Sequence, residues 1–284
     1  MNSRFEALRQ MESFTESMFN RIIAFQEKQH PAWDSTLSFD QRIKGLPLHY
    51  LIFSAHDRDP QLYGPTIAHY YPLREEIQKI AYYWQQTGAK RLADFYCGNG
   101  FMGSLIAREG VNTLGLSQYT AKPNQIERFH DSDCYEFSSN TLEQSQCDAV
   151  FVAWPPADIN PTPHIVTARP KLLIYVYTDH CHPETKQRQC GASDMFDLLS
   201  EQYVLLDQWS ITRPENLLHE IWPDMTPNPE EQRHTRIYVL PQFQDIPLPT
   251  ELPAKTEYPW ETDHNMAMLA LEAKRQLQTQ GILA

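Results

Sequence analysis

Four short apolar runs in the middle of the chain restrict its fold more than any other feature. They are separated by polar or helical stretches, and continuous apolar runs of this length are typical of strands buried on both faces of a parallel sheet. The sequence therefore predicts an α/β fold with a mostly parallel central sheet and helices on both faces. The runs are RLADFYC (91–97), NTLGLS (112–117), CDAVFVAW (147–154) and KLLIYVYT (171–178).

Two later apolar runs occupy residues 203–211 and 236–240. A polar, proline-containing stretch separates them, so we interpret them as an antiparallel pair that closes one edge of the sheet. A helix is predicted over residues 73–88, because Pro72 precedes it, acidic residues fill its first turn and Gly88 ends it.

The pattern divides the chain into three parts. We expect a helical cap or lid over residues 1–71, an α/β domain over 72–240, and a Pro-rich tail with a C-terminal helix over 241–284. Apolar residues at spacings of three and four predict an amphipathic helix at 6–26 within the first part. The last helix is expected near 265–278.

Composition limits the partners and the compartment. The formal net charge is −12, and no run of Lys and Arg is present, which disfavours nucleic acid as a partner. No stretch of about 18 apolar residues occurs, so no membrane span is expected. The five cysteines are odd in number and widely spaced, which indicates reduced thiols and a cytoplasmic location.

Glycines are concentrated where the first apolar run ends. Six of the ten glycines lie between Gly88 and Gly115. Gly98, Gly100 and Gly103 form a G-x-G-x-x-G pattern after a predicted strand and at the start of a helix. Such a loop lets backbone N–H groups and a helix N-terminus approach a ligand, or it is simply a tight turn that binds nothing.

The stretch DFYCGNG, 94–100, resembles the glycine loop of the Rossmann-like (class I) S-adenosylmethionine-dependent methyltransferases. The likeness extends over about 70–240. It implies S-adenosylmethionine as the cofactor, with Asp94, Gly98 and Gly100 around its methionine half. From its position, Asp94 could also order the loop amides, and Cys97 would fill a small, partly apolar space beside the cofactor.

The resemblance suggests further contacts and also has gaps. These enzymes usually carry an acid at the end of the second strand, where this chain has Ser117 and Gln118. An amide can still hydrogen-bond a ribose diol, without the strength that charge adds. The stretch FHDSD resembles the segment that contacts adenine, through Asp131 or Asp133. Tyr70 or Tyr71 is expected near the methionine end, with packing against the cap as the alternative.

A second motif, AWPPAD at 153–158, follows the third apolar run. In amino-methyltransferases the similar loop reads Asp/Asn/Ser-Pro-Pro-aromatic and holds the target amine. Here Trp154 replaces the polar residue before Pro155 and Pro156. Trp154 either stacks on a methyl acceptor or fills the space that a substrate would occupy, and the following proline predicts an extended backbone for it.

His182 is the remaining catalytic candidate, as a general base near the end of a strand. It lies beside Cys181 and close to Cys190, but the spacing does not match a zinc site, so no metal is expected. The uracil-5 methyltransferases, whose glycine loop is also similar, use a cysteine near the C-terminus, and this chain has none after Cys190.

These residues predict an S-adenosylmethionine-dependent methyltransferase acting on a small-molecule or protein substrate. Trp154, Pro155, Pro156 and His182 are the candidate catalytic residues. The alternative is a methyltransferase-like binding or scaffold protein that has lost turnover. Methylation of a nucleic-acid base is disfavoured by the net charge and by the altered Pro-Pro loop.

Overall fold

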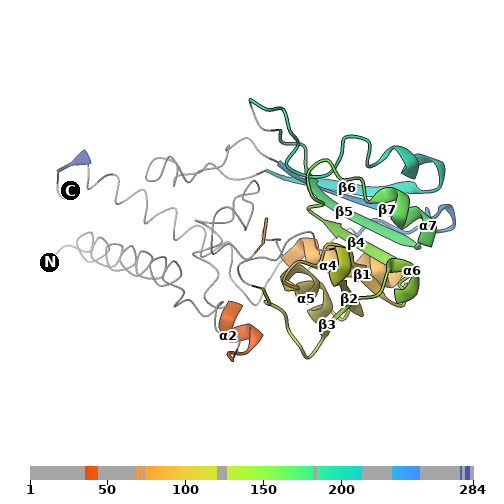
Figure 1. Ribbon diagram of the computed structural model, residues 1–284, viewed down its shortest axis with the longest axis horizontal. Coiled ribbons are helices and arrows are strands. Elements are labelled where there is room, and N and C mark those ends of the chain that lie inside the picture. Colours follow the sequence, from red (N-terminus) through yellow and green to blue (C-terminus); the bar gives the residue numbers. More distant parts are fainter. Residues whose placement is uncertain are drawn as a thin grey trace.

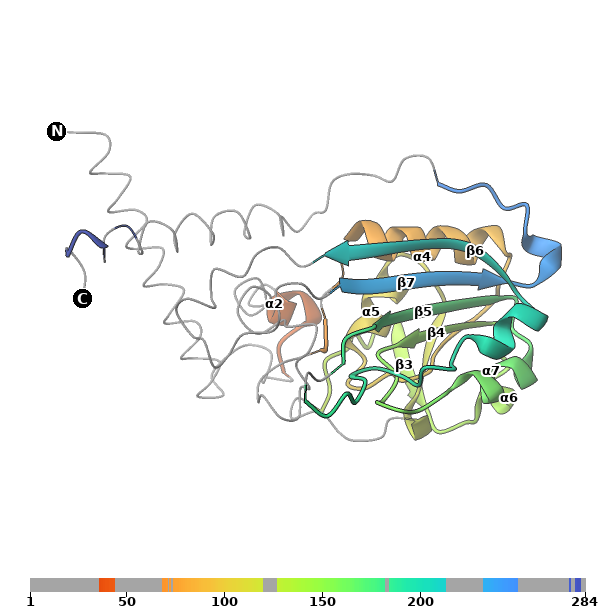
Figure 2. The ribbon, with the colours of Figure 1, turned by 90° about the horizontal axis from the view of Figure 1, so that it is seen from above.

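A computed structural model of the chain describes residues 36–43, 68–70, 72, 74–119, 127–181, 184–212, 232–249, 276 and 279–281. The described residues form a seven-stranded sheet with helices on both faces (Figure 1 and Figure 2). Among them, no helix is long and apolar enough to cross a membrane.

The sheet has the strand order β3-β2-β1-β4-β5-β7-β6. β1 to β5 are parallel to one another, whereas β7 is antiparallel to both β5 and β6. The carboxyl ends of β1, β2, β4 and β5 therefore share one edge, which is where open α/β sheets bind ligands. The strands are β1 (Leu92–Asp94), β2 (Thr113–Leu116), β3 (Tyr135–Ser138), β4 (Ala149–Ala153), β5 (Leu172–Thr178), β6 (Val204–Thr212) and β7 (Gln232–Val239).

The sheet confirms the α/β fold predicted from the apolar runs. The four runs contain β1, β2, β4 and β5, and every residue of these strands is buried. β3 was not predicted. Only Tyr135 is fully buried in it, while Glu136 is exposed, so this outer strand lacks a continuous apolar run.

The predicted antiparallel pair is also confirmed, with one addition. β7 lies between β5 and β6, so β6 alone forms that edge of the sheet. This insertion of an antiparallel strand between β5 and β6 is the arrangement of the Rossmann-like methyltransferase fold. The β6–β7 register is interrupted between Leu205 and Asp207.

Helices cover both faces of the sheet. On one face, α4 contacts the last two strands through an ion pair between Glu76 and Arg233 and a 2.6 Å hydrogen bond from Tyr83 to Asp207. On the other face, the Thr162 hydroxyl of α7 lies 2.9 Å from Tyr175 Oη of β5. The α-helices are α2 (Phe39–Ile43), α4 (Arg74–Gln86), α5 (Phe101–Arg108), α6 (Leu142–Ser145) and α7 (Thr162–Ala168), and the 3₁₀ helices are η2 (Ser117–Tyr119), η3 (Asp197–Glu201) and η6 (Pro241–Phe243).

α4 confirms the helix predicted over 73–88, and Gly88 follows it with φ +59°. The helices predicted at 6–26 and near 265–278 lie outside the described residues, except for isolated positions of the second. Tyr71 and His182 also lie outside them. The described parts of the proposed cap are residues 36–43 and 68–70.

Candidate ligand-binding site

The glycine loop, residues 95–100, connects β1 to α5 at the carboxyl edge of the sheet. Gly98 is exposed and has φ +51°. Among the described residues, apart from Gly98 and its two chain neighbours, no heavy atom lies within 4 Å of the position that a Cβ would take on Gly98. A ligand can therefore approach the backbone of this loop most closely at Gly98.

Gly100 has a different environment, although both residues belong to the same motif. Its φ is +85°, and a Cβ there would lie 2.8 Å from His130 Cβ, 2.8 Å from Phe137 Cζ and 2.9 Å from Tyr135 Cε1. The absent side chain of Gly100 thus leaves room for the protein's own side chains. The backbone of Gly100 is also engaged, because its N–H donates a 2.8 Å hydrogen bond to the Cys97 carbonyl and its carbonyl accepts one of 3.0 Å from the Ser104 N–H.

Asp94, the last residue of β1, is fully buried and links β1 to β3 and α5. Tyr135 Oη donates a 2.9 Å hydrogen bond to Asp94 Oδ2, and the Gly103 N–H of α5 also donates to this carboxylate. Burial raises the pKa of Asp94 to about 7, although both hydrogen bonds lower it. Neither of these two hydrogen bonds comes from residues 95–100, so ordering of the loop amides and contact with a ligand both stay predictions for Asp94.

Two more residues of the loop are held internally. The Cys97 side chain is buried against Ala107 and Tyr135, in the small space expected for it. Asn99 Oδ1 accepts a 3.2 Å hydrogen bond from the Phe101 N–H, and its carbonyl accepts one of 2.8 Å from the Phe129 N–H. The side chain of Asn99 therefore satisfies an N–H at the start of α5.

The carboxyl end of β2 carries exposed polar groups near the loop. Ser117 and Gln118 are both exposed, and Ser117 Oγ donates a 3.0 Å hydrogen bond to the Ser138 carbonyl. Tyr119 stacks on Phe95, with ring centroids 4.0 Å apart. Sequence reasoning missed Tyr119, whose only signal was an aromatic residue shortly after a predicted strand.

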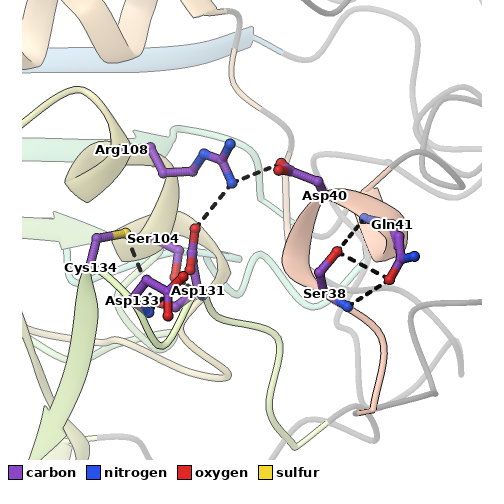
Figure 3. Close-up of polar contacts among 8 residues, drawn as sticks. All are labelled: Ser38, Asp40, Gln41, Ser104, Arg108, Asp131, Asp133 and Cys134. Carbon is purple, nitrogen blue, oxygen red and sulfur yellow. Dashed lines mark hydrogen bonds and ion pairs between the residues drawn. The ribbon is translucent and has the colours of Figure 1, made fainter.

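Asp131 and Asp133 belong to the segment before β3. This segment passes beside the glycine loop, since a Cβ on Gly100 would lie 2.8 Å from the Cβ of His130, the residue before Asp131. Asp131 Oδ2 forms an ion pair of 3.1 Å with Arg108, and the Asp131 N–H donates to Ser104 Oγ at 2.9 Å (Figure 3). Contact of Asp131 or Asp133 with adenine stays a prediction.

Trp154 follows β4 at the carboxyl edge and is 6% exposed. Its indole stacks on Tyr70, with centroids 5.5 Å apart, and on His69, at 5.8 Å. The predicted extended backbone was wrong, because Trp154 has φ +51°. The backbone N–H of Trp154 donates a 2.8 Å hydrogen bond to the Val176 carbonyl. This bond and the two stacked rings together hold a backbone conformation that bulky residues rarely adopt.

The rest of the Pro-Pro loop contacts a segment that follows β5. The Pro155 carbonyl accepts a 2.9 Å hydrogen bond from the Gly191 N–H, and the Gly191 carbonyl accepts one of 3.2 Å from the Asp158 N–H. Pro155 is buried and Pro156 is half-buried. The Pro156 carbonyl also accepts a 3.1 Å hydrogen bond, from the Ile159 N–H, so both proline carbonyls of the loop are already hydrogen-bonded within the protein.

A buried polar cluster lies beside Trp154 and was not found from the sequence. The Arg233 guanidinium is 4.7 Å from the centre of the Tyr70 ring and pairs with Glu76. Trp209 Nε1 donates to the other carboxylate oxygen of Glu76 at 3.3 Å. Burial raises the pKa of Tyr70 well above its usual value, so its hydroxyl stays protonated. The cluster joins α4 to β7 and β6.

A second polar group of residues lies further along the same edge. Ser210 Oγ is 2.7 Å from His234 Nδ1, and His234 Nε2 is 3.5 Å from Asp179 Oδ2. Burial lowers the pKa of His234, so the imidazole is neutral at pH 7. In the tautomer that carries its proton on Nε2, His234 Nδ1 accepts a hydrogen bond from the Ser210 hydroxyl. In the part of the chain that the structure describes, no three His, Cys, Asp or Glu side chains are grouped to bind a metal.

Comparisons with known proteins give likeness in structure only. No protein-family model matches the chain, and no curated protein matches it. The cofactor-bound protein Rv0187 from MTB is 14% identical, with a TM-score of 0.39 over 62% of this chain and 83% of the other. The magnesium protoporphyrin IX methyltransferase ChlM from Synechocystis PCC 6803, with bound SAH, is 11% identical, with a TM-score of 0.34 over 58% of this chain and 82% of its own.

The CcbJ methyltransferase from Streptomyces caelestis is 11% identical, with a TM-score of 0.33 over 64% of this chain and 99% of its own. All of these TM-scores are below 0.5. The strand order and the pairing of the strands, rather than these matches, define the fold.

Proposed function

We propose that this protein binds S-adenosylmethionine at the carboxyl edge of the sheet and transfers its methyl group to a small-molecule or protein substrate. One observation carries the proposal. The exposed backbone at Gly98 follows β1 and precedes α5, in a sheet that has the strand order of the Rossmann-like methyltransferase fold. A ligand at this place meets a helix N-terminus and the ends of several parallel strands.

The residues at this edge fit the cofactor. Gly98 leaves space for close approach, and Ser117 and Gln118 offer oxygen atoms that can accept from ribose hydroxyls. The ionised form of the buried Asp94 favours a cation nearby, which suits a ligand carrying a sulfonium and an ammonium group. Bound there, the cofactor would supply an electrophilic methyl group. The protein would contribute mainly by positioning the two reactants.

The Pro-Pro loop supports an acceptor other than a nucleic-acid base. Trp154 offers no hydrogen-bonding oxygen in the place of Asp, Asn or Ser, and the Pro155 carbonyl is bonded to the Gly191 N–H. The amine-holding arrangement of amino-methyltransferases is therefore incomplete. The net charge of −12 also disfavours a polyanionic substrate.

A second function is favoured by the burial of Trp154. Tyr70 and His69 stack on its indole, so the side chain fills space in the place where a methyl acceptor would bind in an active relative. A protein that binds the cofactor without transferring its methyl group would have this arrangement.

Calorimetry tests the proposal. We expect the wild-type chain to bind S-adenosylmethionine and S-adenosylhomocysteine, and not NAD, since an ionised Asp94 favours a cationic ligand and disfavours a diphosphate. Absence of binding to both adenosyl ligands would rule the proposal out. If both bind, transfer of a labelled methyl group to small molecules and proteins from a cell extract separates an enzyme from a binding protein that has lost turnover.

A further inference from the structure

Three glycines of the glycine-rich stretch between Gly88 and Gly115 surround one tyrosine. A Cβ on Gly100, Gly103 or Gly115 would lie less than 3.0 Å from atoms of Tyr135, closer than real Cβ atoms come to their neighbours. These glycines belong to the glycine loop, α5 and β2. The ring of Tyr135, on β3, is buried at the place where these three elements meet.

The hydroxyl of this ring ends on Asp94. Tyr135 Oη lies 2.9 Å from Asp94 Oδ2, and the Gly103 N–H donates to the same carboxylate. Burial raises the pKa of Tyr135 well above its usual value, so the phenol stays protonated and is a permanent donor to the ionised carboxylate. Tyr135 thus joins β3 to the last residue of β1.

We propose that Tyr135 is a positioning residue whose hydroxyl holds the Asp94 carboxylate in place at the end of β1 and thereby supports the binding of a cationic ligand at Gly98. This inference rests on the proposed function for the identity of the ligand. The link between Tyr135 and Asp94 does not depend on that identity.

The surroundings of Asp94 contain few groups that could produce the same effect. Among the described residues, Tyr135 faces it from β3 and Tyr70 lies close from the segment before α4, while Cys97 of the glycine loop interacts with Tyr135. α5 contributes the Gly103 N–H, and β2 contributes Gly115, which has no side chain. Both tyrosines stay neutral well above pH 7, because burial raises the pKa of each.

The direction of the pH effect follows from the charge. The pKa of Asp94 is raised to about 7, so the carboxyl gains a proton as the pH falls through neutrality. Ligand affinity should then fall up to about tenfold per pH unit below this point, because one negative charge is lost. Removing the Tyr135 hydroxyl removes a donor that lowers the pKa of Asp94. The midpoint should therefore move upward by about one pH unit, the size expected for one hydrogen bond to a charged group.

The test compares S-adenosylmethionine affinity, measured by calorimetry between pH 5.5 and pH 9, in the wild type, Tyr135→Phe and Asp94→Asn. Phenylalanine keeps the ring among the three glycines. The matched control is Tyr175→Phe, which removes an equally buried hydroxyl that lies 2.9 Å from Thr162 Oγ1 against α7, away from the loop. We expect an upward shift in Tyr135→Phe, no pH dependence near neutrality in Asp94→Asn, and the wild-type profile in Tyr175→Phe.

Carbon-13 NMR of labelled aspartate carboxyls in the ligand-free protein provides a readout that needs no ligand. The Asp94 signal, identified by its loss in Asp94→Asn, should titrate at higher pH in Tyr135→Phe than in the wild type. Equal midpoints in the two proteins would overturn the inference, even if the wild type binds the cofactor. Absence of cofactor binding at every pH would instead overturn the proposed function, and with it the ligand part of this inference.

Discussion

Tyr70 stacks on Trp154, with ring centroids 5.5 Å apart and ring planes inclined by 27°. The contact joins the segment before α4 to the loop after β4, which are far apart in the sequence. It buries the indole at the edge of the sheet where a ligand is expected. The role of Trp154 therefore decides between the two proposed functions.

Truncation of Trp154 tests this role. Trp154→Ala should lower the free energy of unfolding by about 3 to 5 kcal/mol, because it removes a large buried side chain. Trp154→Phe keeps a ring beside Tyr70 and should cost clearly less. Urea denaturation measures both. A loss below about 1 kcal/mol for the alanine variant would contradict a packing role and favour contact with an acceptor.

The two glycines of the loop should respond differently to substitution. Gly98→Asn should abolish cofactor binding and change stability by about 1 kcal/mol or less, since asparagine tolerates a positive φ and its Cβ enters open space. Gly100→Ala should destabilise the fold by about 1 to 3 kcal/mol through overpacking against Tyr135 and Phe137, with a further cost from its φ of +85°.

Thermal melting and calorimetry on both variants check this pair. Undiminished binding by Gly98→Asn would mean that the ligand approaches another part of the molecule. Unchanged stability of Gly100→Ala would mean that the rings around it move easily.

Asp94 should make stability depend on pH. Its folded pKa of about 7 lies above the usual 3.8, so the folded protein holds a proton that the unfolded chain has released between these values. The contribution of this proton to stability is present below pH 4 and is lost as the pH rises to 7. The Asp94→Asn variant has no carboxyl proton to lose. Its free energy of unfolding minus that of the wild type should therefore rise between pH 4 and pH 7, by roughly 4 kcal/mol at most.

Urea denaturation at several pH values measures this difference, and subtracting the variant from the wild type cancels the other titrating groups. A difference that stays constant from pH 4 to pH 8 would contradict a raised pKa for Asp94.

Arg108 links α2 to the segment before β3. Its Nη1 lies 2.8 Å from Asp40 Oδ1 and 3.1 Å from Asp131 Oδ2 (Figure 3). Asp40→Asn should change global stability by less than about 1 kcal/mol, because the pair is exposed. Amide hydrogen exchange in residues 36–43 should nevertheless become faster, since the ion pair holds α2 in place.

Hydrogen exchange with mass spectrometry detects this change, and 0.5 M salt should have the same effect on the wild type. Asp133→Asn is the control, because the exposed Asp133 contributes only its backbone N–H to this group. Equal exchange in Asp40→Asn and the wild type would show that other contacts, such as that between Phe39 and Phe129, are sufficient to hold α2.

The apolar runs by themselves determined the central strands. β1, β4 and β5 are buried on both faces, so almost every residue in them must have a side chain that packs in an apolar core. A strand of this kind can be recognised from a few consecutive residues. β3 lies at the edge of the sheet and mixes buried with exposed positions, so the same pattern does not identify it.

The glycine motif was also visible in the sequence, but the use of each glycine was not. Gly98 and Gly100 are two residues apart, and only the tertiary structure distinguishes open space at the first from the rings of Tyr135 and Phe137 at the second. These rings come from a strand more than thirty positions later. The backbone of Trp154 is a similar case. The following proline favours an extended conformation, while Tyr70, His69 and the bond to Val176 hold a positive φ. Local sequence determines local preferences, and contacts between distant segments are strong enough to override them where several act on one residue.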